Sequence, residues 1–121
     1  MVAVARIKVK TFTMIKELLP YGVVKLSVVD KEKNIGRAEV YFTSDGEATL
    51  EILEVDKKYR RMGLGTKMMQ EIVNLLDERN IPCHLYVLVN KEFDLVKWYE
   101  KFGFNLSKTF LNFMWRPVCK S

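Results

Sequence analysis

The sequence contains few of the residues from which metal and disulfide sites are built. Cys83 and Cys119 are the only cysteines, they form no Cys-x-x-Cys pair, and His84 is the only histidine in 121 residues. A structural zinc site needs four such ligands, usually in closely spaced pairs. We therefore expect no metal site, and we expect both thiols to be reduced and buried.

Long apolar stretches and long basic stretches are also lacking. No apolar run approaches the ~20 residues that cross a bilayer, and the first residues have neither the apolar segment nor the cleavage site of a signal peptide. No run of lysines and arginines is of the kind that forms a nucleic-acid-binding tail. These features predict a cytoplasmic protein with no membrane contact and no nucleic-acid partner.

The composition that is present is that of a globular protein. Hydrophobic residues make up 49% of the chain and charged residues 29%, which argues against disorder. A length of 121 residues suits one domain with one core, so residues 1–121 are expected to form a single domain. The formal net charge of +5 suits polyanionic ligands of any kind.

The chain is organised around an apolar strand, a loop with two glycines and a helix. The strand spans residues 50–55, and the loop opens directly onto apolar residues at helical spacing. Amide groups at a helix start lack partners within the helix and carry partial positive charge, so this arrangement suits an anion such as a pyrophosphate. Gly63 and Gly65 let a ligand approach the backbone, and Arg60 and Arg61 can pair with phosphate oxygens.

Spacing excludes two common phosphate loops and favours a third. The lysine-bearing P-loop and the three-glycine dinucleotide motif both need glycines at spacings that this loop does not have. The pattern Arg60-x-x-Gly63-x-Gly65 instead resembles the acetyl-coenzyme A loop of the GCN5-related N-acetyltransferase (GNAT) family. A strand-to-helix turn with two glycines also occurs for packing alone, so this motif does not decide the function by itself.

A second motif, in the expected order, strengthens the resemblance. Tyr99, Gly103 and Phe104 form the Tyr-x-x-x-Gly-Phe pattern that closes the acetyltransferase core, and Asn90 lies where the family usually has an asparagine at a strand end. The two motifs together cover about residues 48–104. Tyr99 follows Asn90 by nine residues, more than is common in the family, which indicates an insertion between them.

Periodicity along the chain predicts a mixed sheet. Alternation and turn residues predict strands at residues 2–10, 23–29, 35–43, 48–55 and 83–89, and two short strands within 104–115. Helical spacing predicts helices from Thr66 onward, at 93–102 and, as a short helix, at 11–19. The expected fold class is α/β (α+β), with a mostly antiparallel sheet of six to seven strands, a central parallel pair formed by 48–55 and 83–89, and two to three flanking helices.

The resemblance implies acetyl-CoA as co-substrate and a role for each matching residue. Backbone groups near Leu53 and Val55 would bond the pantetheine arm and the acetyl carbonyl, and Asn90 would contact the pantetheine region. Tyr99 would act as the general acid that protonates the departing thiolate, since a phenol with a pKa of ~10 lies just above a thiol. The pyrophosphate would be held by seven consecutive residues: Arg60, Arg61, Met62, Gly63, Leu64, Gly65 and Thr66.

A general base is the least determined part of this site. Direct attack of a neutral amine on acetyl-CoA needs no protein nucleophile, so a base only assists deprotonation. The candidates, in order of preference, are Glu51 on the central strand, His84 on the next strand and Glu54. Glu51 shares its side-chain parity with Leu53 and Val55. The plainer interpretation of each candidate is a solvated glutamate or a histidine without a catalytic role.

The acceptor is expected to be a primary amine on an open side of the protein. The region before the first hairpin leaves room for at most one short helix, where the family usually has two that wall the acceptor pocket. An open pocket suits a protein N-terminus, a lysine side chain or a small-molecule amine, or completion by a second subunit in a homodimer. Two other functions stay open: a catalytically inactive acetyl-CoA-binding regulatory module, and a nucleic-acid-binding domain suggested by positive charge and by aromatics such as Trp98 and Trp115.

Overall fold

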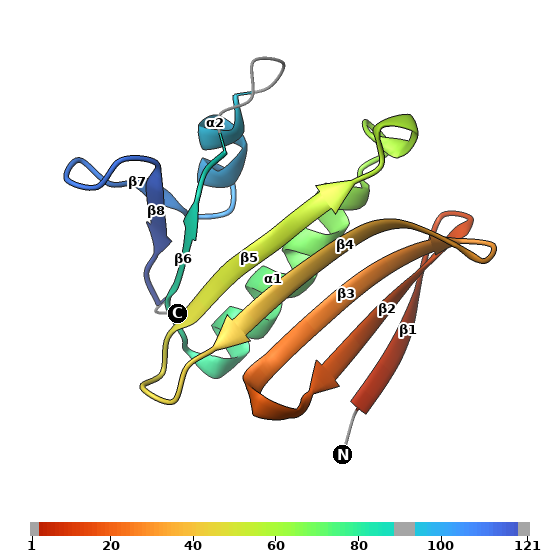
Figure 1. Cartoon of the computed structure of the whole chain (residues 1–121), viewed down its shortest axis with the longest axis horizontal. Helices are drawn as coiled ribbons and strands as arrows, with labels where there is room; N and C mark the ends of the chain where they lie inside the picture. Colours follow the sequence, from red (N-terminus) through yellow and green to blue (C-terminus); the bar gives the residue numbers. More distant parts are fainter. Residues whose placement is uncertain (1–2, 89–93, 119–121) are drawn as a thin grey trace.

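A computed structural model describes residues 3–88 and 94–118. They form one sheet with strand order β1-β2-β3-β4-β5-β6-β8-β7 and two α-helices (Figure 1). The strands are β1 (Ala3–Val9), β2 (Phe12–Leu19), β3 (Val23–Asp30), β4 (Lys33–Phe42), β5 (Ala48–Val55), β6 (Cys83–Tyr86), β7 (Asn105–Leu106) and β8 (Phe113–Arg116), and the helices are α1 (Leu64–Arg79) and α2 (Leu95–Glu100). The predicted fold class is confirmed, although the described sheet has eight strands rather than six or seven. Neither described helix combines the length and apolar character needed to cross a membrane.

The additional strand is β2, in the segment for which helical spacing predicts a short helix. Phe12 and Met14 are 6% and 1% exposed, whereas Ile15 and Leu19 are half-buried on the opposite face. β2 pairs antiparallel with both β1 and β3. The helix prediction for residues 11–19 is wrong because apolar residues occupy both faces of this strand, which imitates helical spacing over a short segment.

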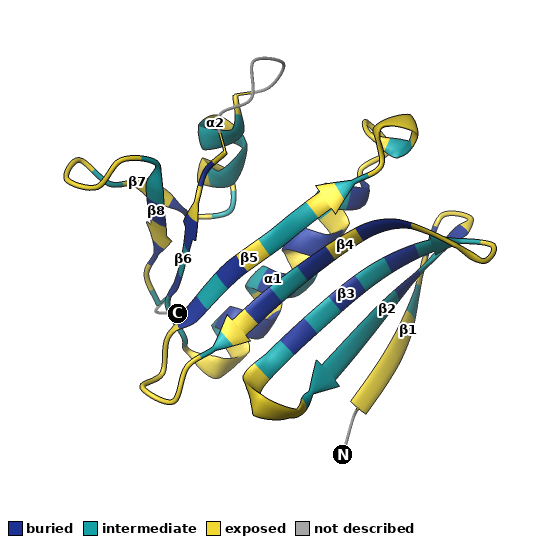
Figure 2. Cartoon of the chain, in the orientation of Figure 1, coloured by how far each residue is buried: buried dark blue, intermediate teal, exposed yellow. Residues whose placement is uncertain are grey.

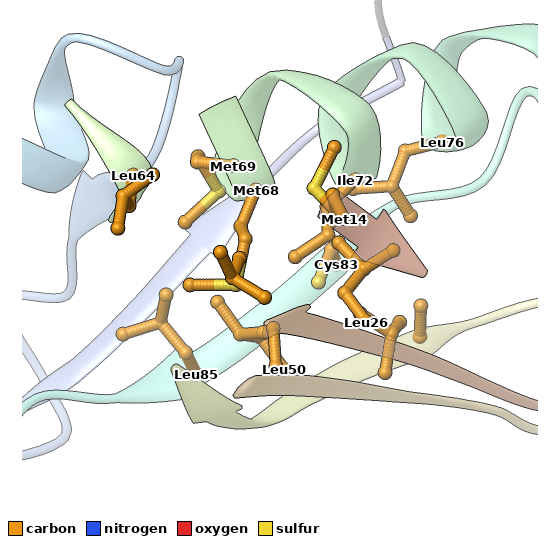
Figure 3. Packing of buried hydrophobic residues seen from close by; sticks show 14 of the residues in the cluster. Met14, Leu26, Leu50, Leu64, Met68, Met69, Ile72, Leu76, Cys83 and Leu85 are labelled. Carbon is orange, nitrogen blue, oxygen red and sulfur yellow. The ribbon is translucent and has the colours of Figure 1, made fainter. Parts of the chain in front are cut away.

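The core lies between one face of the sheet and α1, as the buried stripes along the strands show (Figure 2). The apolar side of α1 packs against buried side chains of β2 to β6 (Figure 3). Burial of each large apolar side chain stabilises the fold by about 1.5–3 kcal/mol, so this layer holds α1 against the sheet. Its six buried residues are Leu64, Met68, Met69, Ile72, Leu75 and Leu76.

The face of β4 and β5 that points away from α1 is open. In Figure 1, α1 lies behind these strands, and no helix of the described chain lies in front of them. Between β2 and β3 there is only the 3-10 turn Pro20–Gly22. Arg37 and Tyr41, on the open face of β4, are exposed. The described segment before β3 therefore adds a strand to the sheet and places no helix over this face.

The predicted parallel pair of β5 and β6 is present but short. Only Ala48 with Cys83 and Thr49 with His84 are paired. Beyond these residues the two strands diverge toward the end of the sheet where α1 begins (Figure 1). β6 ends at Tyr86, before the predicted strand end at residue 89, which lies outside the described residues.

A β-bulge interrupts the pairing of β5 with β4. Val40 lies opposite Leu50 and Glu39 lies opposite Ile52, so Glu51 is an extra residue without a partner on β4. A bulge bends its strand and increases the local twist. The bulge therefore lies where β5 turns away from β6. Beyond it, the edge of β5 that faces β6 is not covered by any described strand.

Candidate active site

The start of α1 is open and free of acidic side chains. Gly63 is the N-cap residue, with φ +80, and its carbonyl accepts the first helical hydrogen bond, from Lys67 N at 3.0 Å. No side chain caps the helix, and its first turn contains no acidic residue. A side-chain carbon at Gly63 would meet nothing within 4 Å. No side-chain cap and no acidic residue of the first turn thus competes with an anion for the first amide groups of α1.

Two side chains that sequence reasoning missed, Tyr59 and Lys10, fix the loop before α1. The Tyr59 hydroxyl donates to Asp30 Oδ2 at 2.9 Å, and the Tyr59 ring lies edge-on to Phe12 with centroids 5.8 Å apart. Lys10 Nζ donates to the Met62 carbonyl at 3.0 Å. The hydrogen bond to Asp30 is the main reason why the pKa of Tyr59 is raised. An aromatic residue just before the arginines was the only signal in the sequence, and nothing marked Lys10.

Arg60 is exposed and lies against the end of β5. Its Nε donates to the Val55 carbonyl at 2.9 Å. Arg61 has a left-handed backbone, with φ +68, and Met62 is 40% exposed. The structure therefore places one predicted phosphate ligand against one of the backbone groups predicted for the pantetheine arm. A carbonyl oxygen has two lone pairs, so this contact leaves Val55 able to accept a second hydrogen bond.

Leu53 and Val55 lie on the stretch of β5 that has diverged from β6. They are opposite Ala38 and Gly36 of β4, and their side chains pack partly against the core on the α1 side. Leu50 lies on the same face before the bulge. The predicted parity of Glu51 with Leu53 does not hold, because the bulge at Glu51 shifts the alternation by one residue.

Tyr99 lies in α2, which Asp94 caps by accepting a hydrogen bond from Lys97 N at 3.1 Å. The Tyr99 ring is half-buried and packs edge-on against Trp98 and Phe104, with centroid distances of 5.1 and 5.9 Å. Burial raises the pKa of the phenol, because the charged form loses hydration. Tyr99 is therefore protonated at neutral pH, which is the state that a proton donor needs.

The end of β5, the start of α1 and α2 meet at Gly65. A side-chain carbon at Gly65 would lie 3.8 Å from Trp98 Cζ2 and 3.9 Å from Val55 Cγ2. This contact brings the helix that carries Tyr99 to the open helix start. The two sequence motifs, which are far apart along the chain, are thus parts of one place in the fold.

His84 lies at the other end of the β5–β6 pair. Its Nε2 is 3.0 Å from Thr49 Oγ1, and its ring stacks on Phe113 at a centroid distance of 5.4 Å. It faces away from α1, since the neighbouring Cys83 and Leu85 are buried in the core. Here the two strands are still paired. His84 also lines a pocket of about 300 Å³, together with Glu47, Pro82, Cys83, Phe113, Trp115 and Arg116.

The two glutamates differ in their surroundings. Glu51 is exposed at the bulge, where β5 begins to leave β6. Glu54 pairs with Arg37 on β4, with Oε1 2.5 Å from Nε, and this contact is the main reason why the pKa of Arg37 is raised. Of the two carboxylates, Glu51 is thus the one that lies at the divergence of the strands.

Asn90 lies outside the described residues, as does the first part of the stretch between Asn90 and Tyr99 in which an insertion is predicted. Leu64 is 1% exposed, so it contributes to the predicted loop through its backbone and anchors α1 with its side chain. Among the residues that the structure describes, no group of three or more histidine, cysteine or acidic side chains is placed to hold a metal ion.

Comparison with known proteins identifies the family pattern over most of the chain. Residues 10–104 match the family model described as the acetyltransferase (GNAT) family. N-alpha-acetyltransferase 50 of Danio rerio is 33% identical to this chain over 57 residues, which are 46% of this chain and 33% of that protein. The match thus spans about a third of the length of this curated relative.

Solved structures share the fold. The ribosomal-protein-S18-alanine N-acetyltransferase from Escherichia coli has a TM-score of 0.68 and 18% identity, covering 100% of this chain and 96% of that one. Naa50 of Arabidopsis thaliana, in complex with the bisubstrate analogue CoA-Ac-MVNAL, has a TM-score of 0.62 and 19% identity, covering 78% and 72%. The eight-stranded sheet with diverging β5 and β6 is therefore an arrangement similar to that of N-acetyltransferases.

Proposed function

The chain belongs to the acetyltransferase (GNAT) family, and we propose that it moves an acetyl group from acetyl-CoA to a primary amine. The observation that carries this proposal is the parallel pair that stops after two residue pairs and diverges toward an uncapped helix start. The proposal also draws on the relative named as an N-alpha-acetyltransferase.

The loop fits the diphosphate of coenzyme A. The first turn of α1 offers amide groups with no side-chain cap and no acidic neighbour, and Gly63 leaves the approach clear. In the proposed role, residues 60–66 hold the diphosphate through these amides, and Arg61 adds positive charge. Arg60 either keeps its hydrogen bond to Val55 or turns to the phosphate, which its flexible stem allows. Backbone groups near Leu53 and Val55 would align the pantetheine arm as an additional strand-like partner of β5.

The reaction requires one bond to form and one to break. Acetyl-CoA supplies an acetyl group activated as a thioester. The neutral amine attacks its carbonyl carbon, a C–N bond forms, the C–S bond breaks, and the sulfur leaves as a thiolate. Tyr99 donates its proton to this thiolate and is later reprotonated from solvent. The proton lost by the amine passes to solvent or to a base, for which Glu51 at the bulge is our first choice and His84 beside Thr49 the second.

The acceptor would approach the open face of the sheet. No described helix covers the front of β4 and β5 there (Figure 1), so the acceptor can be part of a larger molecule. The bisubstrate analogue bound by the Arabidopsis protein contains the peptide sequence MVNAL. We therefore favour the N-terminal amine of a polypeptide over a lysine side chain or a small amine.

Release of free thiol tests the proposed reaction. The protein is mixed with acetyl-CoA and, in turn, with peptides bearing a free N-terminus, N-blocked peptides bearing one lysine, and small amines. We expect thiol release above background with peptides that have a free N-terminus. Binding of acetyl-CoA without turnover on any amine would instead support an inactive acetyl-CoA-binding regulatory module, and no binding at all would refute the assignment of the loop.

A further inference from the structure

Arg116 is the one buried charged residue among those that the structure describes, at 7% exposure. It ends β8 and pairs with Cys83, which places it on the α1 side of the sheet. Its Nη1 and Nη2 donate to the two carboxylate oxygens of Asp77 in α1, at 2.9 and 3.3 Å, and its Nε donates to the Phe102 carbonyl at 2.7 Å. A guanidinium withdrawn from water is costly unless its donors are matched, and here each nitrogen has a partner.

The Phe102 carbonyl lies just beyond the end of α2, and it accepts its hydrogen bond from Arg116. α2 is only six residues long, too short to be stable without external contacts. Its last turn is closed by Phe102 N and Phe104 N, which both donate to the Tyr99 carbonyl, at 3.0 and 3.4 Å. Arg116 therefore holds Phe102, and the amide of Phe102 donates to the Tyr99 carbonyl.

Gly103 makes this contact possible. Its φ is +93, and a side-chain carbon there would lie 3.2 Å from Arg116 Nε and 3.6 Å from Arg116 Cγ. Any larger residue would thus be strained and would also push the arginine away from Phe102. Glycine at position 103 of the Tyr-x-x-x-Gly-Phe pattern therefore lets the side chain of Arg116 lie against the backbone after α2.

We propose that Arg116 is a positioning residue for acetyl transfer, which holds Tyr99 in place by linking the end of α2 to Asp77 of α1. The proposal rests on the proposed function, because it assigns Arg116 a task in placing the proton donor. The contacts form a chain from α1 through Asp77, Arg116 and Phe102 to Tyr99. α1 also carries the open helix start, so the same rigid element is a reference for both the coenzyme loop and the proton donor.

The arginine fork has no equivalent in lysine. Two parallel hydrogen bonds to one carboxylate and a third to a carbonyl fix the direction of the guanidinium plane, whereas an ammonium group is a point charge on a flexible stem. Arg116→Lys should therefore keep the charge and lose the geometry. A displacement of a catalytic group by 1 Å is able to lower a rate by about 100-fold.

The test compares Arg116→Lys and Asp77→Asn with Glu71→Gln. Glu71 also forms an ion pair between α1 and the sheet, with Lys16 at 3.4 Å, but the structure as described gives it no contact with α2, so Glu71→Gln is the matched control. With acetyl-CoA and the amine that gives the highest turnover, we expect kcat to fall about 10- to 100-fold in the first two variants. The dissociation constant of acetyl-CoA should stay within about twofold, since the loop contacts are intact, and the control should match the wild type.

A double mutant separates positioning from general stability. If Arg116 acts through Tyr99, Arg116→Lys should have little further effect on kcat in a Tyr99→Phe background, because the two changes remove the same contribution. A folded Arg116→Lys protein with wild-type kcat, or a loss of kcat that persists in full in the Tyr99→Phe background, would overturn the proposal. If Arg116→Lys does not fold, the same comparison of kcat with and without Tyr99→Phe is made with Asp77→Asn.

A spectroscopic measurement is independent of turnover. In NMR spectra, the signals of the Tyr99 ring are assigned by their disappearance in Tyr99→Phe. Their chemical shifts are sensitive to the ring currents of Trp98 and Phe104. We expect them to shift in Arg116→Lys and Asp77→Asn but not in Glu71→Gln. If no amine is acetylated, the proposed function fails while this measurement still decides on the link, and unchanged Tyr99 resonances in both variants would refute it.

Discussion

The two parts of the sheet are held together in different ways. Strands β1 to β5 are joined by antiparallel ladders of seven or eight residue pairs each. The C-terminal part, described at residues 83–88 and 94–116, has two parallel residue pairs with them and is joined mainly by side chains, among them the core residues Leu85 and Met114, Trp98 near Gly65, and Arg116. The first part is thus a continuous frame held by backbone pairing, whereas the second is held to it mainly by side-chain packing.

The difference separates two tasks. The proposed coenzyme loop is fixed to the frame through Tyr59 with Asp30 and through Lys10 with Met62. The proposed proton donor, Tyr99, belongs to the C-terminal part. Changes in the frame should therefore alter coenzyme affinity, and changes in the C-terminal part should alter turnover.

Gly65→Glu should have the largest effect, because Gly65 lies where the two parts meet. Its side chain would bring a negative charge to the proposed diphosphate site, and a like-charge contact costs several kcal/mol. We expect acetyl-CoA affinity to fall by ~100-fold or more, measured by calorimetry. Gly65→Ala is the control, since its added carbon would lie 3.8 Å from Trp98 at ordinary contact distance. Comparable affinity in the two variants would contradict a charge effect at this position.

Tyr99→Phe should affect only turnover. The ring and its packing against Trp98 and Phe104 are kept, and only the proton that the thiolate receives is lost. We expect kcat to fall about 10- to 1,000-fold and the acetyl-CoA dissociation constant to stay within about twofold, in steady-state kinetics and calorimetry. A variant as fast as the wild type would remove Tyr99 from the mechanism.

Tyr59→Phe removes the same hydroxyl group beside the frame. It should weaken acetyl-CoA binding and leave kcat unchanged, the reverse of Tyr99→Phe. It removes the hydrogen bond to Asp30 and loosens the loop, while Tyr99 and its surroundings stay intact. One hydrogen bond contributes about 0.5–1.5 kcal/mol, so we expect acetyl-CoA to bind about 2- to 10-fold more weakly. At saturating acetyl-CoA, kcat should be unchanged, and a fall in kcat alone would mean that the two parts are not separable.

Cys83→Ala should change the pH dependence of stability at the joint between the parts. Burial raises the pKa of the Cys83 thiol from 9.0 to about 12. The folded protein therefore keeps a proton that the unfolded chain loses, so this contribution is complete below pH 9 and is lost between pH 9 and about 12. In chemical unfolding at increasing pH, we expect the wild type to lose up to ~1.4 kcal/mol per pH unit more than the variant in that range. Parallel stability curves for the two proteins would contradict this.

The sequence predicted best where local pattern and tertiary role agree. Alternation placed β5 at the same bounds as the structure, and helical spacing placed α1 within two residues of its start, because both bury one regular apolar face. β2 was mistaken for a helix because Ile15 and Leu19 add a second apolar face. A bulge cannot be seen in a single strand, since it depends on the pairing partner, so the face of Glu51 was not predictable.

Long-range polar contacts were outside the reach of the sequence. The two motifs predicted Gly63, Gly65 and Tyr99 as site residues, because such motifs mark residue types that backbone geometry or chemistry requires. Tyr59 with Asp30 and Arg116 with Asp77 are joined only by the folded chain, being 29 and 39 residues apart. Local periodicity has no signal for such pairs.

The most direct test of the central claim is a calorimetric titration of acetyl-CoA into the wild type, Gly63→Glu and Gly46→Glu. Gly63 and Gly46 have similar backbones, with φ +80 and +85, and a side-chain carbon at either would meet nothing within 4 Å. The two substitutions therefore introduce the same strain and charge, one at the start of α1 and one in the turn between β4 and β5. We predict that Gly63→Glu loses measurable binding while Gly46→Glu binds like the wild type. Equal affinities in all three proteins would contradict the claim that the start of α1 holds the coenzyme.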